Sequence, residues 1–278
     1  MNVKIFDVDQ GNAALIISPM GHTILLDCGH NSDTGFRPSQ YLRGLGIDGF
    51  EKNLDLLVLS HADQDHISDI HNVSRLNPAV LARNADVSPQ RIRQVKIETA
   101  GFVEPEVEQY IALQERYNSP IFVPNWGGVI LEYFRNDPIN FEDLNDLSLV
   151  TFARYGNTGL VLPGDLSKQG WDYLINNHPQ KDLFRENLKK TNIFVASHHG
   201  REDGYSEEIF KFCQPDIIIF SDKGIEHDTQ LTQNLYAKHA KGILFSGMGN
   251  SNYRYILTTR NDGPIDISTD GVRFTVSI

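Results

Sequence analysis

The chain has 278 residues, of which 40% are hydrophobic, so it can bury a sizeable core in one large domain or two small ones. Its formal net charge of −11 disfavours a protein that holds nucleic acid through a broadly basic surface, but it does not exclude an acidic enzyme with a local basic groove. Met1–Gln10 lacks the regions of a signal peptide, and no uncharged apolar run reaches the length of a membrane span, so we expect a cytoplasmic protein without a membrane partner.

In the first third of the chain, three short strands separated by turn residues are expected to form two neighbouring hairpins of an antiparallel sheet. The strand candidates are Val3–Val8, Ala13–Ile17 and Thr23–Leu26. A short helix is expected over Gln40–Gly46, against the preference of its two glycines. The run Leu54–Leu59, in which five of six residues are apolar, then predicts a buried strand.

The end of this buried strand concentrates residue types that bind metal ions. Two histidines and two aspartates fall within six positions, namely His61, Asp63, Asp65 and His66. Imidazole nitrogens and carboxylate oxygens suit Zn, Mn or Fe, and without a cysteine in the cluster a thiolate cage is not expected. The alternative is a solvated helix start, but such a start needs one capping aspartate and no histidine. We interpret this stretch as a metal site.

After this motif, the sequence predicts a mixture of helices, strands and polar connections. A helix is expected over His66–Leu76, and Pro78 must end it. Residues 83–106 are charged and are predicted to be irregular, either as a flap near the site or as a surface excursion. The next candidates are an amphipathic helix over Val107–Tyr117 and strands at Ile121–Val123 and Val129–Phe134.

A second β-rich half follows, and we expect it to pack with the first in one domain over residues 1–278. It opens with a predicted hairpin formed by Ser148–Ala153 and Gly159–Leu162. The later candidates are strands at Asn192–Ala196, Asp216–Phe220 and beyond Ile243, and helices at Trp171–Asn176, Glu207–Cys213 and Thr229–His239. Two β-rich halves with helices between and outside them indicate a sandwich covered by helices.

Potential ligands recur where the predicted strands end. Outside the central motif these residues are Asp27, Asp165, His198, His199 and His227. A rigid sheet can hold such side chains in place with little ordering of loops. The two adjacent histidines have no packing reason to follow a buried strand. Asp165 could instead be a turn residue, His227 could lie in a surface loop, and Asp27 suits the orientation of an imidazole as well as metal binding.

Several motifs, in this order, resemble the metallo-β-lactamase fold and in particular the hydrolase domain of ComEC-type competence proteins. His61–His66 is similar to the HxHxDH signature, with Asp63 in place of the middle histidine. The other matching segments are Phe6–Ala13, Leu25–Gly29, Asn145–Val150, Leu162–Leu166 and Ser197–Gly200. The resemblance covers roughly residues 1–249. It implies an α/β (α+β) fold, a four-layer αββα sandwich, with two divalent metal ions and a hydroxide activated by them.

The resemblance also implies roles for single residues. His61 and Asp63 would bind one ion, which we call the first ion. Asp65 and His66 would bind the second ion, and Asp165 would bridge both.

For one ligand of the first ion, this chain departs from the family's pattern. Most members of the superfamily supply a third histidine there, whereas this chain has the segment that begins with Asn145. We therefore expect His198 or His199 to take that place and His227 to complete the second ion. Asn145 itself would lie near the site, and Arg201 is a candidate to bind a substrate phosphate, although a surface arginine is the simpler reading.

This ligand set favours one class of reaction. Two ions about 3.5–4 Å apart activate a shared water and clamp the attacking and leaving oxygens of a displacement. The carboxylates Asp63, Asp65 and Asp165 bring more negative charge than three histidines would, which favours Mn²⁺ beside Zn²⁺. We expect hydrolysis of a phosphodiester, in nucleic acid or in a nucleotide-derived molecule, with Asp63 or Asp65 available to shuttle a proton.

Two other functions are compatible with the same motifs. The metal core could hydrolyse a lactone, a thioester or another small ester, or a degenerate member could serve as a non-catalytic binding subunit of a larger system. The nearly complete ligand set argues against the second. A basic flap formed by residues 84–106 would favour an anionic polymer, and a closed apolar pocket would favour a small ester. The basic residues concerned are Arg83, Arg91, Arg93 and Lys96. An enzyme that acts alone or with an operon-encoded partner is expected, in an undetermined oligomeric state.

Overall fold

The computed structural model describes residues 1–119, 124–224, 231–247 and 250–278. Within these residues, seven strands form one sheet in the order β15-β14-β1-β2-β3-β4-β5. Their bounds are Asn2–Ile5 (β1), Ala14–Ile17 (β2), Thr23–Leu26 (β3), Leu56–Val58 (β4), Val80–Ala82 (β5), Ile265–Thr269 (β14) and Phe274–Ser277 (β15). The first three strands pair antiparallel, which confirms the two expected hairpins, whereas β3, β4 and β5 are parallel.

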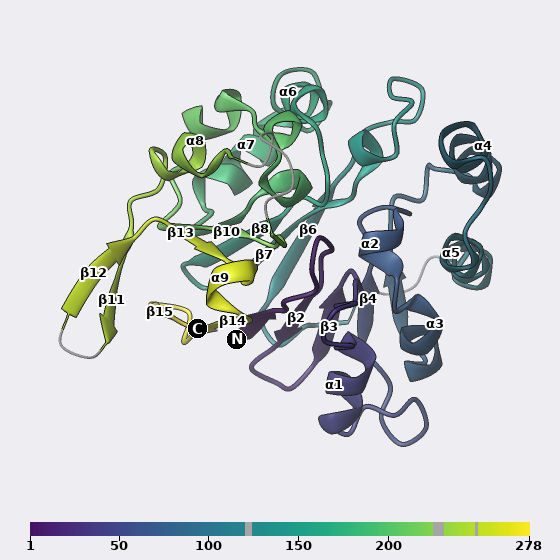
Figure 1. Ribbon diagram of the computed structural model, residues 1–278, viewed down its shortest axis with the longest axis horizontal. Helices are drawn as coiled ribbons and strands as arrows, with labels where there is room; N and C mark the ends of the chain where they lie inside the picture. Colours follow the sequence, from purple (N-terminus) through teal and green to yellow (C-terminus); the bar gives the residue numbers. More distant parts are fainter. Residues whose placement is uncertain (120–123, 225–230, 248–249) are drawn as a thin grey trace.

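A second sheet has the order β13-β10-β9-β8-β7-β6. Its strands are Ile130–Phe134 (β6), Val150–Tyr155 (β7), Thr158–Leu162 (β8), Ile193–Val195 (β9), Ile217–Phe220 (β10) and Ile256–Thr258 (β13). The predicted hairpin is confirmed as the antiparallel pair β7–β8, and β8, β9, β10 and β13 run parallel. A separate ribbon of β11, Ile243–Gly247, and β12, Asn250–Arg254, projects at the left edge of Figure 1.

Three apolar layers hold the sheets and helices together. Along β4, Leu56 and Val58 point to the layer between the sheets, while Leu57 points to the outer face of the first sheet, because successive side chains of a strand alternate. The helices beside that outer face are α1 (Pro38–Gly44), α2 (Gln64–Ile67), α3 (Ile70–Val73), α4 (Pro89–Ala100) and α5 (Pro105–Arg116). The outer face of the second sheet packs on α6 (Lys168–Asn176), α7 (Lys181–Lys189) and α8 (Gln233–Ala237).

This arrangement confirms the expected αββα sandwich, with helices outside both sheets (Figure 1). A last short helix, α9 (Thr259–Asp262), follows β13. In the parts of the chain that the structure describes, each helix is too short or too polar to cross a lipid bilayer.

The prediction of a continuous helix over His66–Leu76 is wrong. The segment is broken into α2, α3 and a 3₁₀ turn at Ser74–Leu76. The cause is the loop after β3, whose Cys28 donates its backbone N–H to the carbonyl of His66 at 2.7 Å and accepts from the backbone of Asp69 at 2.8 Å. These bonds use backbone groups that a continuous helix would need for itself.

The prediction that residues 83–106 are irregular is also wrong. They contain α4, whose N-terminus is capped by the side chain of Ser88, with Pro89 in the first turn, and whose C-terminus is followed by Gly101 at a φ of 82°. The helix shows little apolar periodicity because Ile92 and Lys96 are its buried residues. The strand candidate Ile121–Val123 lies outside the described residues.

Candidate metal centre

Loops from both sheets bring polar side chains together at one end of the sandwich. Asp27 directly follows β3, and the central motif follows β4 in the same sheet. Asp165, His199 and Ser221 follow β8, β9 and β10 in the other sheet. Because the carboxyl ends of parallel strands lie along one edge of each sheet, residues distant in the sequence meet here.

Four of the expected ligands form a compact cluster: Asp65, His66, Asp165 and His199, with one ligand atom of each lying within 4.8 Å of the others. His66 Nε2 lies 2.9 Å from Asp165 Oδ1. His199 Nε2 lies 3.3 Å from both Asp65 Oδ2 and Asp165 Oδ2. Two imidazoles and two carboxylates around one point are a donor set suited to a divalent transition-metal ion.

Each of the two histidines of this cluster is oriented by a hydrogen bond at its other ring nitrogen, Nδ1. His66 Nδ1 donates to Asp27 Oδ2 at 2.8 Å, which directs Nε2 into the cluster. Asp27 also accepts the backbone N–H of Ser60 at 2.7 Å and the side-chain amide of Asn12 at 3.0 Å. His199 Nδ1 donates to the carbonyl of Ser221 at 2.9 Å. Outer hydrogen bonds of this kind fix the tautomer and the ring orientation of metal-binding histidines, and the contacts of Asp27 are of this kind.

The charges of the cluster depend on one another. Burial alone would lower the pKa of His199, but the carboxylates of Asp165 and Asp65 outweigh it and raise the pKa to about 9. Burial also opposes ionisation of Asp165, yet His199 and His66 hold the pKa of this carboxyl well below its usual range. Without a metal ion, the imidazoliums and carboxylates therefore balance each other's charge. A metal ion must displace the protons to bind, so metal affinity rises with pH.

The stability of the metal-free protein is expected to fall as the pH rises from about 6.5 to about 9. The folded-state pKa of His199 is raised, so the stability that its charge contributes is complete below the pKa of the unfolded chain and is lost as the imidazolium deprotonates. Urea unfolding in excess chelator at several pH values measures this. A His199→Gln variant should show a shallower decline, and wild-type stability that rises over this interval would contradict the prediction.

His61 carries a buried nitrogen that lacks a partner. It is 4% exposed, and its Nε2 makes no hydrogen bond with any described residue, although it lies 3.8 Å from Asp63 Oδ2. Its Nδ1 lies 3.0 Å from Ser60 Oγ. Burial, with help from His66, lowers the pKa of His61, so the imidazole is neutral. A buried neutral imidazole with a free nitrogen facing a carboxylate fits a metal ligand.

The adjacent histidines of the second half point to different places. Both have left-handed backbone conformations, with φ of 50° at His198 and 55° at His199. His198 Nδ1 lies 2.9 Å from Asp203 Oδ1, and its Nε2 lies 3.8 Å from Asp165 Oδ2, farther than that of His199. The structure therefore brings His199 into the cluster with Asp65, and which of the two ions this histidine pair would bind stays a prediction.

The remaining site candidates, Asn145, Arg201 and His227, are not among the four clustered residues. Asn145 begins a 3₁₀ turn that ends at Leu147, and its Oδ1 is buried without a hydrogen bond to any described residue. The Nε of Arg201 is likewise buried and makes no hydrogen bond with any described residue. His227 lies outside the described residues.

Two glycines let the motif loop approach the backbone of its neighbours. A Cβ at Gly11 would lie 2.1 Å from the carbonyl oxygen of Asp65, and a Cβ at Gly29 would lie 2.3 Å from the same atom. Both glycines belong to the segments that resemble the family, and this contact gives them a steric reason to be there. They set the position of Asp65 in the cluster.

The Gly29→Ala variant is expected to lose about 1–3 kcal/mol of unfolding free energy, because the new methyl group must displace the loop that carries Asp65. Its metal affinity should fall in parallel. Urea unfolding and chelator competition measure the two effects. Gly44→Ala is the matched control, because a Cβ at this helical position meets nothing within 4 Å and alanine favours a helix. Equal stabilities for the two variants would contradict the prediction.

One basic residue of the possible flap reaches the central motif. Lys96 of α4 places its Nζ 2.9 Å from Asp63 Oδ1. The other basic side chains of the segment bind elsewhere, with Arg91 donating to the carbonyl of Glu142 and Arg93 paired with Glu108. Residues 84–106 thus bring one lysine to the motif rather than a broadly basic flap.

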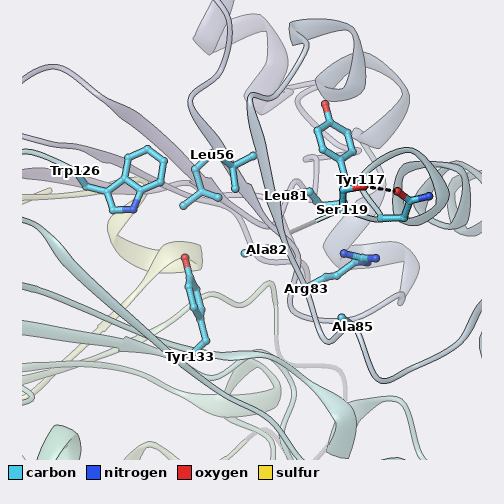
Figure 2. A pocket seen from close by; sticks show the side chains of 11 residues that line it. Leu56, Leu81, Ala82, Arg83, Ala85, Tyr117, Ser119, Trp126 and Tyr133 are labelled. Carbon is cyan, nitrogen blue, oxygen red and sulfur yellow. Dashed lines mark hydrogen bonds between the residues drawn. The ribbon is translucent and has the colours of Figure 1, made fainter. Parts of the chain in front are cut away.

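A cavity of about 400 Å³ opens between the edge strands β5 and β6, apart from the cluster. Figure 2 shows Trp126 and Tyr133 on one side of it and Tyr117 and Arg83 on the other. Its lining is mostly apolar, and it includes none of the clustered ligands. This cavity is therefore not the closed apolar pocket over the metals that would favour a small ester.

The fold and the histidine–aspartate site define a metallo-β-lactamase-type protein. The family model described as "Metallo-beta-lactamase superfamily" matches residues 6–205, and the chain belongs to that superfamily.

Among individual proteins, the chain is 26% identical over 286 residues to "ComE operon protein 3" of Bacillus subtilis (strain 168), covering 91% of this chain and 33% of that protein. It is 25% identical over 251 residues to "Competence protein ComA" of Neisseria gonorrhoeae, covering 87% and 30%. These relatives confirm the resemblance to competence proteins, and the chain spans about a third of their length.

Proposed function

We propose that this chain hydrolyses phosphodiesters with two divalent ions, acting on nucleic acid or on a nucleotide-derived molecule. Membership of the metallo-β-lactamase superfamily and the aspartate–histidine cluster support a metal-dependent hydrolase. The observation that carries the two-ion proposal is a second donor pair beside the cluster. His61 and Asp63 face each other there, with the ring of His61 centred 4.2 Å from that of His66. Two adjacent ions suit displacement at phosphorus.

The geometry suggests how the ligands divide. His61 Nε2 and Asp63 Oδ2 would hold the first ion, and Asp165 would lie between the two ions. Asp65, His66 and His199 would hold the second, so that this position has four donors without His227. The carboxylate-rich set favours Mn²⁺ beside Zn²⁺.

The chain's own residues would serve the reaction in three ways. Two bound ions would supply the Lewis acidity that activates water and stabilises the leaving oxygen. Asp63 and Asp65 have side chains that are 34% and 38% exposed, so they can pass a proton between the site and solvent. Asp27 and the carbonyl of Ser221 keep the imidazoles of His66 and His199 aligned. Arg201 would bind a substrate phosphate.

Metal content and a substrate panel test this function. Protein reconstituted with Mn²⁺ or Zn²⁺ would be measured by mass spectrometry and assayed with bis-p-nitrophenyl phosphate, p-nitrophenyl acetate and a lactone. About two ions per chain with phosphodiester turnover would support the proposal, and DNA, RNA and cyclic nucleotides would follow. Two ions with ester or lactone turnover alone would indicate a small-ester hydrolase. A chain that binds no metal would be a binding scaffold.

We further propose that residues 1–278 act as one hydrolase domain. A cytoplasmic location and an operon-encoded protein partner stay predictions from the sequence.

A further inference from the structure

Asp63 stands at the motif position where the HxHxDH signature has a histidine, and this replacement changes the chemistry of the ligand. A carboxylate brings a negative charge that a neutral imidazole lacks, and it has two oxygens that can both approach a metal ion. In the structure the two oxygens are distinguished. Oδ2 faces His61 Nε2 at 3.8 Å, and Oδ1 accepts from Lys96 Nζ at 2.9 Å.

The lysine is built into the fold. Lys96 is 8% exposed, on a helix whose other buried residue is Ile92. A buried ammonium is costly unless it is paired, so its ion pair with Asp63 differs from the exposed pair of Arg93 with Glu108 on the same helix. Helix α4 therefore carries one buried cation to one oxygen of one candidate ligand.

We propose that Lys96 is a positioning residue for the first metal ion, and this inference rests on the proposed two-ion function. By holding Oδ1, the ammonium leaves Oδ2 as the single oxygen of Asp63 that faces His61 and the ion. Its positive charge offsets the charge that the aspartate adds. The Asp63–Lys96 pair thus takes the place of one imidazole, with a fixed donor atom and no net charge.

Metal-binding measurements on a set of variants test this role without relying on activity. The variants are Lys96→Met, Lys96→Arg, Asp63→His and the double variant Asp63→His/Lys96→Met. Affinities come from competition with a chelator, and stoichiometry from mass spectrometry. Lys96→Met should weaken the first ion about 10–100-fold and leave the second unchanged, whereas Lys96→Arg should retain much of the affinity.

The double variant gives the sharpest readout. Asp63→His alone leaves the lysine unpaired beside a cation, so it should bind the first ion poorly. Removing the lysine as well should restore binding, since an imidazole needs no compensating charge. The two substitutions should therefore be strongly non-additive. Arg93→Met is the control, because it removes an exposed cation from the same helix and should change neither affinity.

The outcomes separate this inference from the function on which it rests. If wild-type protein binds two ions but Lys96→Met binds the first equally well or more tightly, the lysine does not position the ligand, and the proposed function stands. If wild-type protein binds fewer than two ions, both fall. Thermal unfolding checks that each variant folds. Should Lys96→Met fail to fold, two-ion binding by the double variant supports the inference, and its failure to bind the first ion overturns it.

Discussion

Replacement of Asp165 by alanine is expected to lower kcat/KM for a phosphodiester on the order of 10³-fold or more. Asp165 contacts the Nε2 atoms of both His66, at 2.9 Å, and His199, at 3.3 Å. It is the residue proposed to lie between the two ions, so its loss affects both. Steady-state kinetics with bis-p-nitrophenyl phosphate, together with metal content, measures the effect.

Two companion variants define what the loss means. Asp165→Asn keeps the size of the side chain but removes its charge, and it should be nearly as inactive if the charge holds the ions. Asp182→Ala removes a carboxylate whose side chain is 87% exposed, and it should behave as wild type. Turnover within about tenfold of wild type in both Asp165 variants would exclude this residue from the reaction.

The Asp27→Ala variant is expected to lose about 3–5 kcal/mol of unfolding free energy and to bind metal about 10–100-fold more weakly. Burial opposes ionisation of Asp27, but His66, Ser60 and Asn12 together lower its pKa, so the folded protein holds a carboxylate here. Alanine would leave these three donors without their acceptor. It would also have to adopt the left-handed φ of 55° found at this position. Urea unfolding in chelator and metal competition measure the two effects separately.

Asp27→Asn separates the backbone contribution from the ionic one. Asparagine tolerates the left-handed conformation and can still accept the backbone N–H of Ser60. It cannot supply the negative charge beside His66. We expect it to recover part of the stability and little of the metal affinity. An alanine variant that loses less than about 1 kcal/mol would show that Asp27 is not needed to hold the site together.

The sequence predicted those parts of the protein in which local pattern and burial agree. Thr23–Leu26 is a strand as expected, and the predicted strand at Leu54–Leu59 contains β4. Both are followed directly by polar residues that lie at the site. Aspartate and histidine after a buried strand are a strong signal, because neither residue type helps to pack a core. Asp65, His66 and Asp165, which the structure brings into one cluster, were all singled out in this way.

The sequence could not predict how residues distant along the chain are placed relative to one another. The backbone at residues 198 and 199 is left-handed, and in this turn the imidazole of His199 lies toward Asp65. Helix α4 was missed because its exposed face is charged and it buries little. Yet Ser88, Pro89 and Gly101 are its start and stop signals, and they could have been recognised. The contact of Lys96 with Asp63 depends on the placement of that helix, which no local pattern reports.

The ligand cluster draws on both halves of the sandwich, since Asp65 and His66 follow a strand of one sheet and Asp165 and His199 follow strands of the other. Ions that bind this cluster would therefore cross-link the two sheets. Through mass action, free metal at a hundredfold excess over its Kd adds about 2.7 kcal/mol of stability to the folded chain. The supply of metal in the cell would then govern the lifetime of the protein as well as its chemistry, because the metal-free protein unfolds more often and is then open to proteases.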